Sequence, residues 1–82
     1  MKKHPDKAST YQKEIEIFAQ NVIRLRKERK LTQLKLAELS GLEEKQVGFI
    51  EQARRSPNFR TIMALKNGLA CQFKDLFKGI GT

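Results

Sequence analysis

Apolar residues recur at intervals of three and four in the first third of the chain, which is the spacing of an amphipathic helix. Charged side chains lie mostly off this stripe, which consists of Ile15, Phe18, Ala19, Val22 and Leu25. The pattern predicts a helix over residues 14–30.

Two shorter helices are predicted next, because residues that start or stop helices mark both of them. Thr32 is a good N-cap for a helix over 33–40, and Gly41 suits the left-handed position that ends it. A further helix over 44–52 then turns its apolar positions inward.

The last third of the chain predicts two more helices, after a polar segment over 53–57. Asn58 is a good N-cap for the first of them, and Gln72 begins the second. Their inward-facing residues are expected to be Phe59, Ile62, Met63, Leu65, Leu69, Phe73, Leu76 and Phe77. No segment shows the alternation of a strand, so the sequence predicts an all-α fold, a compact five-helix domain.

The two ends of the chain differ from its middle. Residues 1–13 are rich in lysine and contain a single acid, Asp6, so we interpret them as a basic, flexible N-terminal arm. Residues 79–82 contain two glycines and are interpreted as a C-terminal tail. The folded domain is therefore predicted over residues 14–78.

The excess of basic over acidic residues limits the kinds of partner that the protein is expected to bind. The 82 residues include 17 lysines and arginines against 9 acids, which gives a formal net charge of +8. A field of this sign attracts polyanions such as DNA, RNA or an anionic membrane. The basic and apolar residues are spread over several predicted helices, which argues against a membrane-surface helix. RNA is disfavoured because most aromatic residues are needed inside the fold and leave no stacking platform.

Residues for redox, metal or catalytic chemistry are scarce. Cysteine and histidine each occur once, as Cys71 and His4. A lone cysteine forms no internal disulfide, and this pair supports neither a cysteine-based zinc site nor a catalytic dyad. No apolar run approaches the roughly 20 residues of a membrane-spanning helix. We therefore expect a cytoplasmic protein that is not an enzyme and needs no cofactor or metal.

The segment 33–52 has the features of a helix-turn-helix. Small Ala37 lies in the middle of its first helix, where a second helix must cross closely. Gly41 provides the positive φ of the sharp turn, and Val47 and Ile50 anchor the second helix. This arrangement projects the second helix outward, where its exposed side can enter the major groove of DNA.

These residues belong to a longer series of matching motifs. They are Phe18-Ala19-x-x-Val22-x-x-Leu25-Arg26, Leu31-Thr32-Gln33-x-x-Leu36-Ala37, Gly41-Leu42, Val47-x-x-Ile50-Glu51, Arg54-Arg55-x-Pro57 and Leu69-x-Cys71-x-x-x-Asp75-Leu76-Phe77. With them, the stretch 18–77 resembles the lambda repressor-like (Cro/repressor, XRE-type) helix-turn-helix DNA-binding family of bacteria and phages. It departs from the family at Glu43, where a Ser or Thr cap is usual, and at Lys66, where the family has a small apolar residue.

The resemblance implies a DNA-binding surface. It places Gln33 against a backbone phosphate at the start of its helix. It implies that the outward side of the second helix faces base edges and that nearby arginines contact the sugar-phosphate backbone. The residues in these roles are Glu44, Lys45, Gly48 and Phe49 for the bases, and Arg54, Arg55 and Arg60 for the backbone. The resemblance also implies a structural ion pair between Arg26 and Glu51.

The outward residues have chemistry that suits base edges, with alternatives. Lys45 can donate to guanine O6 or N7, or to a phosphate. Glu44 can accept from a cytosine amino group, or can simply stabilise the helix N-terminus. Phe49 offers an apolar face to a thymine methyl or to a protein partner, and Gly48 permits close approach to the groove.

The resulting hypothesis is a sequence-specific DNA-binding transcriptional regulator, either a repressor or a small autoregulatory controller. One such domain contacts little DNA, so binding to a palindromic operator as a homodimer is expected. The dimer interface is predicted at Leu76, Phe77 and Ile80. The alternative is a protein-interaction module of the same fold, an antitoxin or antirepressor partner, in which Phe49 and the acidic start of its helix meet protein.

Overall fold

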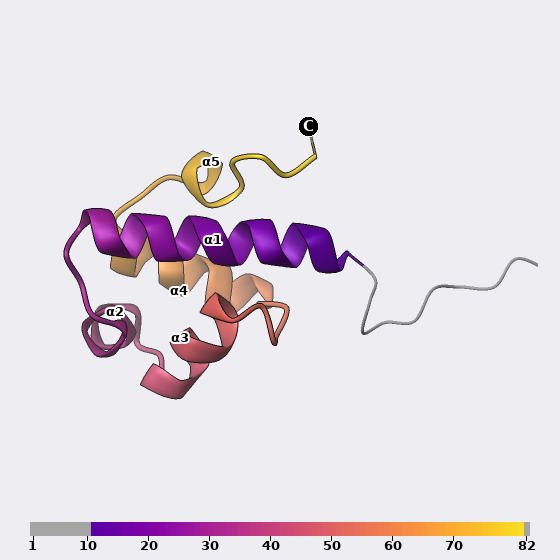
Figure 1. Ribbon diagram of the computed structural model, residues 1–82. Helices are drawn as coiled ribbons and strands as arrows, with labels where there is room; N and C mark the ends of the chain where they lie inside the picture. Colours follow the sequence, from indigo (N-terminus) through magenta and orange to yellow (C-terminus); the bar gives the residue numbers. More distant parts are fainter. Residues whose placement is uncertain (1–10, 82) are drawn as a thin grey trace, which may run out of the picture.

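The structure is a computed structural model that describes residues 11–81 (Figure 1). Over this range the chain is all-α and has no strand. Its five helices are α1 (Gln12–Glu28), α2 (Gln33–Ser40), α3 (Glu44–Glu51), α4 (Phe59–Leu69) and α5 (Phe73–Leu76). The predicted five-helix, all-α class is confirmed.

The start of α1 differs from the prediction. The helix begins at Gln12 rather than at residue 14 and ends at Glu28 rather than at residue 30. Tyr11 precedes it in a left-handed conformation with φ of 62°. The last part of the predicted arm is therefore helical, and residues 1–10 lie outside the described residues. At the other end Lys30 takes φ of 57°, which stops the helix before the predicted boundary.

The helices are arranged around α1, which runs the length of the molecule with α5 on one side and α3 on the other (Figure 1). The helix-turn-helix pair α2 and α3 pack against each other, and α2 also packs closely against α4. Thr32 caps α2 by accepting from the Lys35 N–H at 3.0 Å. Gly41 ends it with φ of 69°, as the turn requires.

The core forms where α1, α2, α3, α4 and α5 converge. Its fully buried large side chains are Leu36, Leu65, Leu69, Leu76, Val22 and Val47. Burial of each such side chain stabilises the fold by about 1.5–3 kcal/mol. Ala37 is also buried, as the predicted close crossing of α2 and α3 requires.

Three residues predicted to face inward are exposed instead, namely Phe59 and, to a smaller extent, Met63 (36%) and Phe77 (37%). Phe59 was expected to face the core, but 71% of its surface is exposed at the start of α4. Leu76 was predicted in a dimer interface and is instead completely buried. The first turn of a helix often extends beyond its neighbours, so an apolar residue there satisfies the helical period without reaching the core.

Asn21 holds the short α5 in place. This side chain is 7% exposed, and its Nδ2 donates to the carbonyls of Leu76 at 2.7 Å and Lys78 at 2.9 Å. These carbonyls lie at the end of α5 and just beyond it, where a helix leaves acceptors unpaired. One amide of α1 therefore fixes the C-terminal segment that contains Phe77 and Ile80.

Gly68 allows α4 to approach the end of α2. A Cβ atom at this position would overlap Ser40 Oγ and would lie 3.1 Å from Ser40 Cβ and 3.2 Å from Ser40 Cα. The Ser40 hydroxyl is shielded from solvent and has no hydrogen-bond partner within residues 11–81. Rotation of the hydroxyl could relieve the overlap with Oγ, but the contacts with Ser40 Cβ and Cα would remain tight.

Gly68→Ala is expected to lower the free energy of unfolding by about 1 kcal/mol, because overpacking exceeds the gain in helix propensity. Ser40→Ala removes an unpaired hydroxyl and is expected to be neutral or stabilising. In the Ser40→Ala background Gly68→Ala should cost much less. Urea denaturation of the four proteins measures this coupling, and strictly additive effects would contradict the close contact.

None of the helices within residues 11–81 has the length and apolarity needed to cross a membrane.

Candidate nucleic-acid interface

The outward side of α3 is exposed at its start and open at Gly48. Glu44 and Lys45 are exposed, whereas Gly48 is half-buried. A Cβ atom at Gly48 would meet nothing within 4 Å, so the space beside this residue is open. The helix therefore presents a side with a charged start and an open centre, as a helix must to enter a groove.

The N-terminus of α3 is stabilised by residues that are unusual in this position. The Glu43 N–H donates to Gln46 Oε1 at 3.0 Å, which satisfies one of the donors left unpaired at a helix start. Glu43 and Glu44 are both exposed, and their charges interact favourably with the helix dipole. The two acids therefore stabilise the start of α3 without needing a contact to a ligand.

A buried ion pair ties α3 to the rest of the domain. Arg26 Nε donates to Glu51 Oε2 at 2.6 Å, and Arg26 Nη2 donates to Glu51 Oε1 at 3.1 Å. The side chains are 13% and 5% exposed, respectively. This is the pair that the resemblance implies, and its two-pronged geometry fixes the end of α3 against α1.

Gln33 joins this ion pair. Its Nε2 donates to Glu51 Oε1 at 2.9 Å, so the amide expected at a phosphate is engaged inside the protein. Arg26 Nη1 also donates to the carbonyl of Leu31 at 2.9 Å, just before α2. The start of α2 and the end of α3 are thus held by the same carboxylate. Gln33 retains one amide hydrogen and its carbonyl oxygen for other partners.

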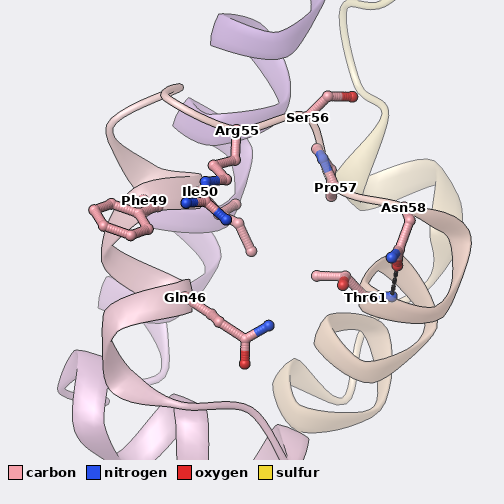
Figure 2. Close-up of a pocket in the computed structure, with 8 residues that line it drawn as sticks. All are labelled: Gln46, Phe49, Ile50, Arg55, Ser56, Pro57, Asn58 and Thr61. Atoms are coloured by element: carbon pink, nitrogen blue, oxygen red, sulfur yellow. Dashed lines mark hydrogen bonds between the residues drawn. The ribbon is translucent and has the colours of Figure 1, made fainter.

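Phe49 does not present a bare ring. The guanidinium carbons of Arg54 and Arg55 each lie 5.0 Å from its ring centroid. Both distances are within the range of cation–π interactions. The apolar face expected at Phe49 therefore has two guanidinium groups close to it. Figure 2 shows the Arg55 guanidinium beside the ring.

The turn that ends α3 explains why these groups meet. Ala53 has φ of 57°, its N–H donates to the Ile50 carbonyl at 3.0 Å, and the Arg54 N–H donates to the Phe49 carbonyl at 3.0 Å. This is the hydrogen-bond pattern of a Schellman motif, which folds the residue after the left-handed position back over the last turn. The backbone of this turn therefore brings Arg54 close to Phe49.

A cavity of about 140 Å³ separates α3 from the start of α4 (Figure 2). It is lined by Gln46, Phe49, Ile50, Arg55, Ser56, Pro57, Asn58 and Thr61. Its volume is below the roughly 300 Å³ at which pockets for small organic ligands begin. Asn58 Oδ1 accepts from the Thr61 N–H at 2.8 Å and caps α4, and Arg60 is exposed in the first turn of that helix.

Gln12 adds a contact that the sequence did not indicate. Its Nε2 donates at 3.2 Å to the carbonyl of Ala53, in the turn after α3. The start of α1 therefore lies beside the turn that contains Arg54 and Arg55. No local signal could have found this contact, because 41 positions separate the two residues in the sequence.

An apolar surface lies around the C-terminal segment. Phe77 is 37% exposed, and its ring lies 5.7 Å from Phe18 and 6.5 Å from Phe73, measured between centroids. Ile80 is half-buried against the core. A shallow cavity of about 230 Å³ opens here, lined by Tyr11, Glu14, Ile15, Phe18, Ser56, Pro57, Ile62, Phe77 and Ile80. Two of the three residues predicted for a dimer interface thus border one apolar hollow.

Cys71 lies in the core, and burial raises the pKa of its thiol above the ordinary value. The thiol is therefore protonated at neutral pH and is a poor nucleophile. Within residues 11–81 no three His, Cys, Asp or Glu side chains gather closely enough to hold a metal ion.

Comparison with known proteins places the chain in a family. The sequence pattern of the helix-turn-helix family HTH_3 matches residues 22–76. The restriction-modification controller protein C.AhdI from Aeromonas hydrophila is 33% identical, with a TM-score of 0.74 over 77% of this chain and 96% of that one. An HTH_3 family transcriptional regulator from Vibrio cholerae is 28% identical, with a TM-score of 0.79 over 84% of this chain and 39% of the regulator.

The wild-type restriction-modification controller protein C.Esp1396I shares the fold, with 22% identity and a TM-score of 0.73 over 78% of this chain and 83% of that one. A comparison with curated protein sequences finds no match. The fold and the outward α3 define a DNA-binding transcriptional regulator of the helix-turn-helix class. Within that class, the chain belongs to the HTH_3 family, which is of the XRE type.

Proposed function

We propose that this protein is a sequence-specific regulator that reads DNA with the outward side of α3. The observation that carries the proposal is the open surface of this helix at Gly48, between the exposed Lys45 and the arginines that follow the helix. The similarity to C.AhdI, a restriction-modification controller protein, supports the role of a small controller. A repressor and an autoregulatory controller both fit this geometry. As a DNA-binding regulator, encoded by a bacterium or a phage, it acts in the cytoplasm.

The residues of the interface divide into two roles. Lys45 donates to guanine or to a phosphate, and Glu44 accepts from a cytosine amino group. The exposed guanidinium groups of Arg54, Arg55 and Arg60 neutralise phosphates and supply most of the affinity. Gln33 orients Glu51 through its Nε2 and donates its remaining amide hydrogen to a phosphate.

We infer that the operator-binding form is a homodimer. A single domain of this size contacts one half-site, and the half-sites of a palindrome lie about 34–36 Å apart. The apolar hollow bordered by Phe77 and Ile80 supplies a surface for a second copy. Phe59 is 71% exposed and lies in the sequence between Pro57 and Ile62, which both line the hollow, so we expect it to extend this surface. A stable interface needs about 800 Å² from each partner, so neighbouring exposed apolar residues must contribute.

Selection of bound sequences from a random DNA pool tests the proposal. We expect a palindromic motif whose half-sites are one helical turn apart. Lys45→Ala should relax one position in each half-site, and an unchanged motif would remove Lys45 from base recognition. The absence of any enriched motif would contradict sequence-specific binding.

Salt dependence tests the phosphate contacts. Three arginines in each of two protomers would give a slope of log affinity against log salt of about −5. Arg60→Ala should make the slope shallower by about 2 in the dimer, because it removes one contact from each protomer. Lys74→Ala is the matched control, since Lys74 is exposed on α5, across α1 from α3 (Figure 1). A wild-type slope near zero would contradict the proposed interface.

The alternative function, a protein-interaction module, has less support. An antitoxin or antirepressor partner would use Phe49 as a bare apolar contact. Two guanidinium carbons lie 5.0 Å from the ring centroid, so the surroundings of the ring are positively charged rather than purely apolar.

A further inference from the structure

The cluster of Phe49, Arg54 and Arg55 brings two like charges to one ring. Each guanidinium carbon lies 5.0 Å from the ring centroid, although adjacent arginines in a strongly basic chain repel each other. The negative face of an aromatic ring offsets part of this repulsion. Neither arginine has an ion pair with an acid among those found within residues 11–81. The ring is therefore the group that orients both guanidinium groups.

Stacking has a consequence for hydrogen bonding. The donors of a guanidinium group lie in its plane, so a group that rests on a ring can still direct N–H bonds outward at its edges. The Arg54 backbone is also fixed, because its N–H donates to the Phe49 carbonyl at 3.0 Å. Two otherwise flexible side chains are thus ordered before any partner arrives.

We propose that Phe49 is a positioning residue that pre-orders the guanidinium groups of Arg54 and Arg55 for phosphate oxygens, rather than a residue that reads a base. The proposal rests on the proposed function for its ligand, a DNA phosphate. Ordering a long side chain on binding lowers affinity, and a preformed contact with the ring reduces that loss. Phe49 therefore raises affinity through its neighbours and without a contact of its own.

Binding of the selected duplex by ring variants is the first test. Phe49→Leu keeps an apolar side chain but removes the π face, and it should weaken binding about 10-fold. Phe49→Tyr keeps the ring and should bind within about twofold of the wild type. Equal losses in both variants would overturn the proposal, because they would show that the aromatic ring is not what matters.

A double-mutant cycle identifies the groups through which Phe49 acts. In a chain with Arg54→Ala and Arg55→Ala, adding Phe49→Leu should change affinity by less than about twofold. An undiminished 10-fold loss in that background would overturn the proposal, because Phe49 would then act independently of the arginines.

Replacement of thymine by uracil in the duplex separates positioning from base reading. The loss caused by Phe49→Leu should be the same on both duplexes, since uracil lacks only the methyl group. Disappearance of the loss on the uracil duplex would overturn the proposal, because it would assign Phe49 to a thymine methyl.

Proton spectra of the free protein test the stack without DNA. The side-chain methylene protons of Arg54 and Arg55 should show ring-current shifts that persist in Phe49→Tyr and vanish in Phe49→Leu. Random-coil positions for these protons in the wild type would overturn the proposal. Failure of the wild type to select any duplex would instead refute the proposed function, and the shifts would still decide whether the ring orders the arginines.

Discussion

Glu51→Ala is expected to lower the free energy of unfolding by about 3–5 kcal/mol, because it removes one partner of a buried ion pair. The carboxylate accepts from Arg26 at 2.6 Å and 3.1 Å and from Gln33 at 2.9 Å. Without it, an arginine side chain that is only 13% exposed loses its counter-ion, and the Gln33 amide loses an acceptor. Urea denaturation followed by circular dichroism measures the change.

Two variants control for the loss of side-chain volume and charge. Glu44→Ala removes an exposed carboxylate from the same helix and should change stability by no more than about 0.5 kcal/mol. Arg26→Met combined with Glu51→Leu replaces the pair by apolar side chains and should recover a large part of the loss. If Glu51→Ala were as mild as Glu44→Ala, the ion pair could not be what anchors α3.

Most of the fold was predictable because residues next to the helix ends determine where several of the helices begin and end. Thr32 and Asn58 each accept a hydrogen bond from a backbone N–H three residues later, as their N-cap assignments require. Gly41 takes the positive φ expected of the turn. The start of α1 was misplaced because no capping residue marks it. Tyr11 lacks a side-chain cap, and the long-range bond from Gln12 to Ala53 secures the first turn.

The resemblance names the expected interface residues, but the partners that these residues have inside the protein were less predictable. The resemblance implied the pair of Arg26 with Glu51, whereas the addition of Gln33 depends on how α2 crosses α3. The arginines over Phe49 required the left-handed turn at Ala53, and alanine gives no sequence signal for that conformation. Such tertiary contacts produce no regular spacing of apolar or polar residues, so a sequence pattern does not reveal them.

The C-terminal residues illustrate the same limit. Leu76 and Phe77 are neighbours in the sequence, yet Leu76 is fully buried and Phe77 is 37% exposed. A helix of four residues is too short for apolar periodicity to indicate which residue faces the core. The hydrogen bonds from Asn21 to the segment after α5 decide the orientation.

Phe59→Asp is expected to convert the proposed homodimer into a monomer and to weaken operator binding by about 100-fold, because linked half-site contacts are lost. Phe59 is 71% exposed and lies in the sequence between Pro57 and Ile62, which line the apolar hollow that contains Phe77 and Ile80. A charged group there would have to be buried at the interface without a partner. Sedimentation equilibrium measures the mass, and titration of the selected duplex measures affinity.

Phe59 is a better probe of the dimer than Phe77, whose ring packs against Phe18 within the same protomer. Because Phe59 is mostly exposed, its replacement should change the free energy of unfolding of the monomer by no more than about 0.5 kcal/mol. Leu39→Asp is the matched control, since Leu39 is 50% exposed and lies on α2, a helix that contributes no residue to the lining of the hollow. A Phe59→Asp protein that stayed dimeric and bound the duplex normally would show that two copies meet through a different surface.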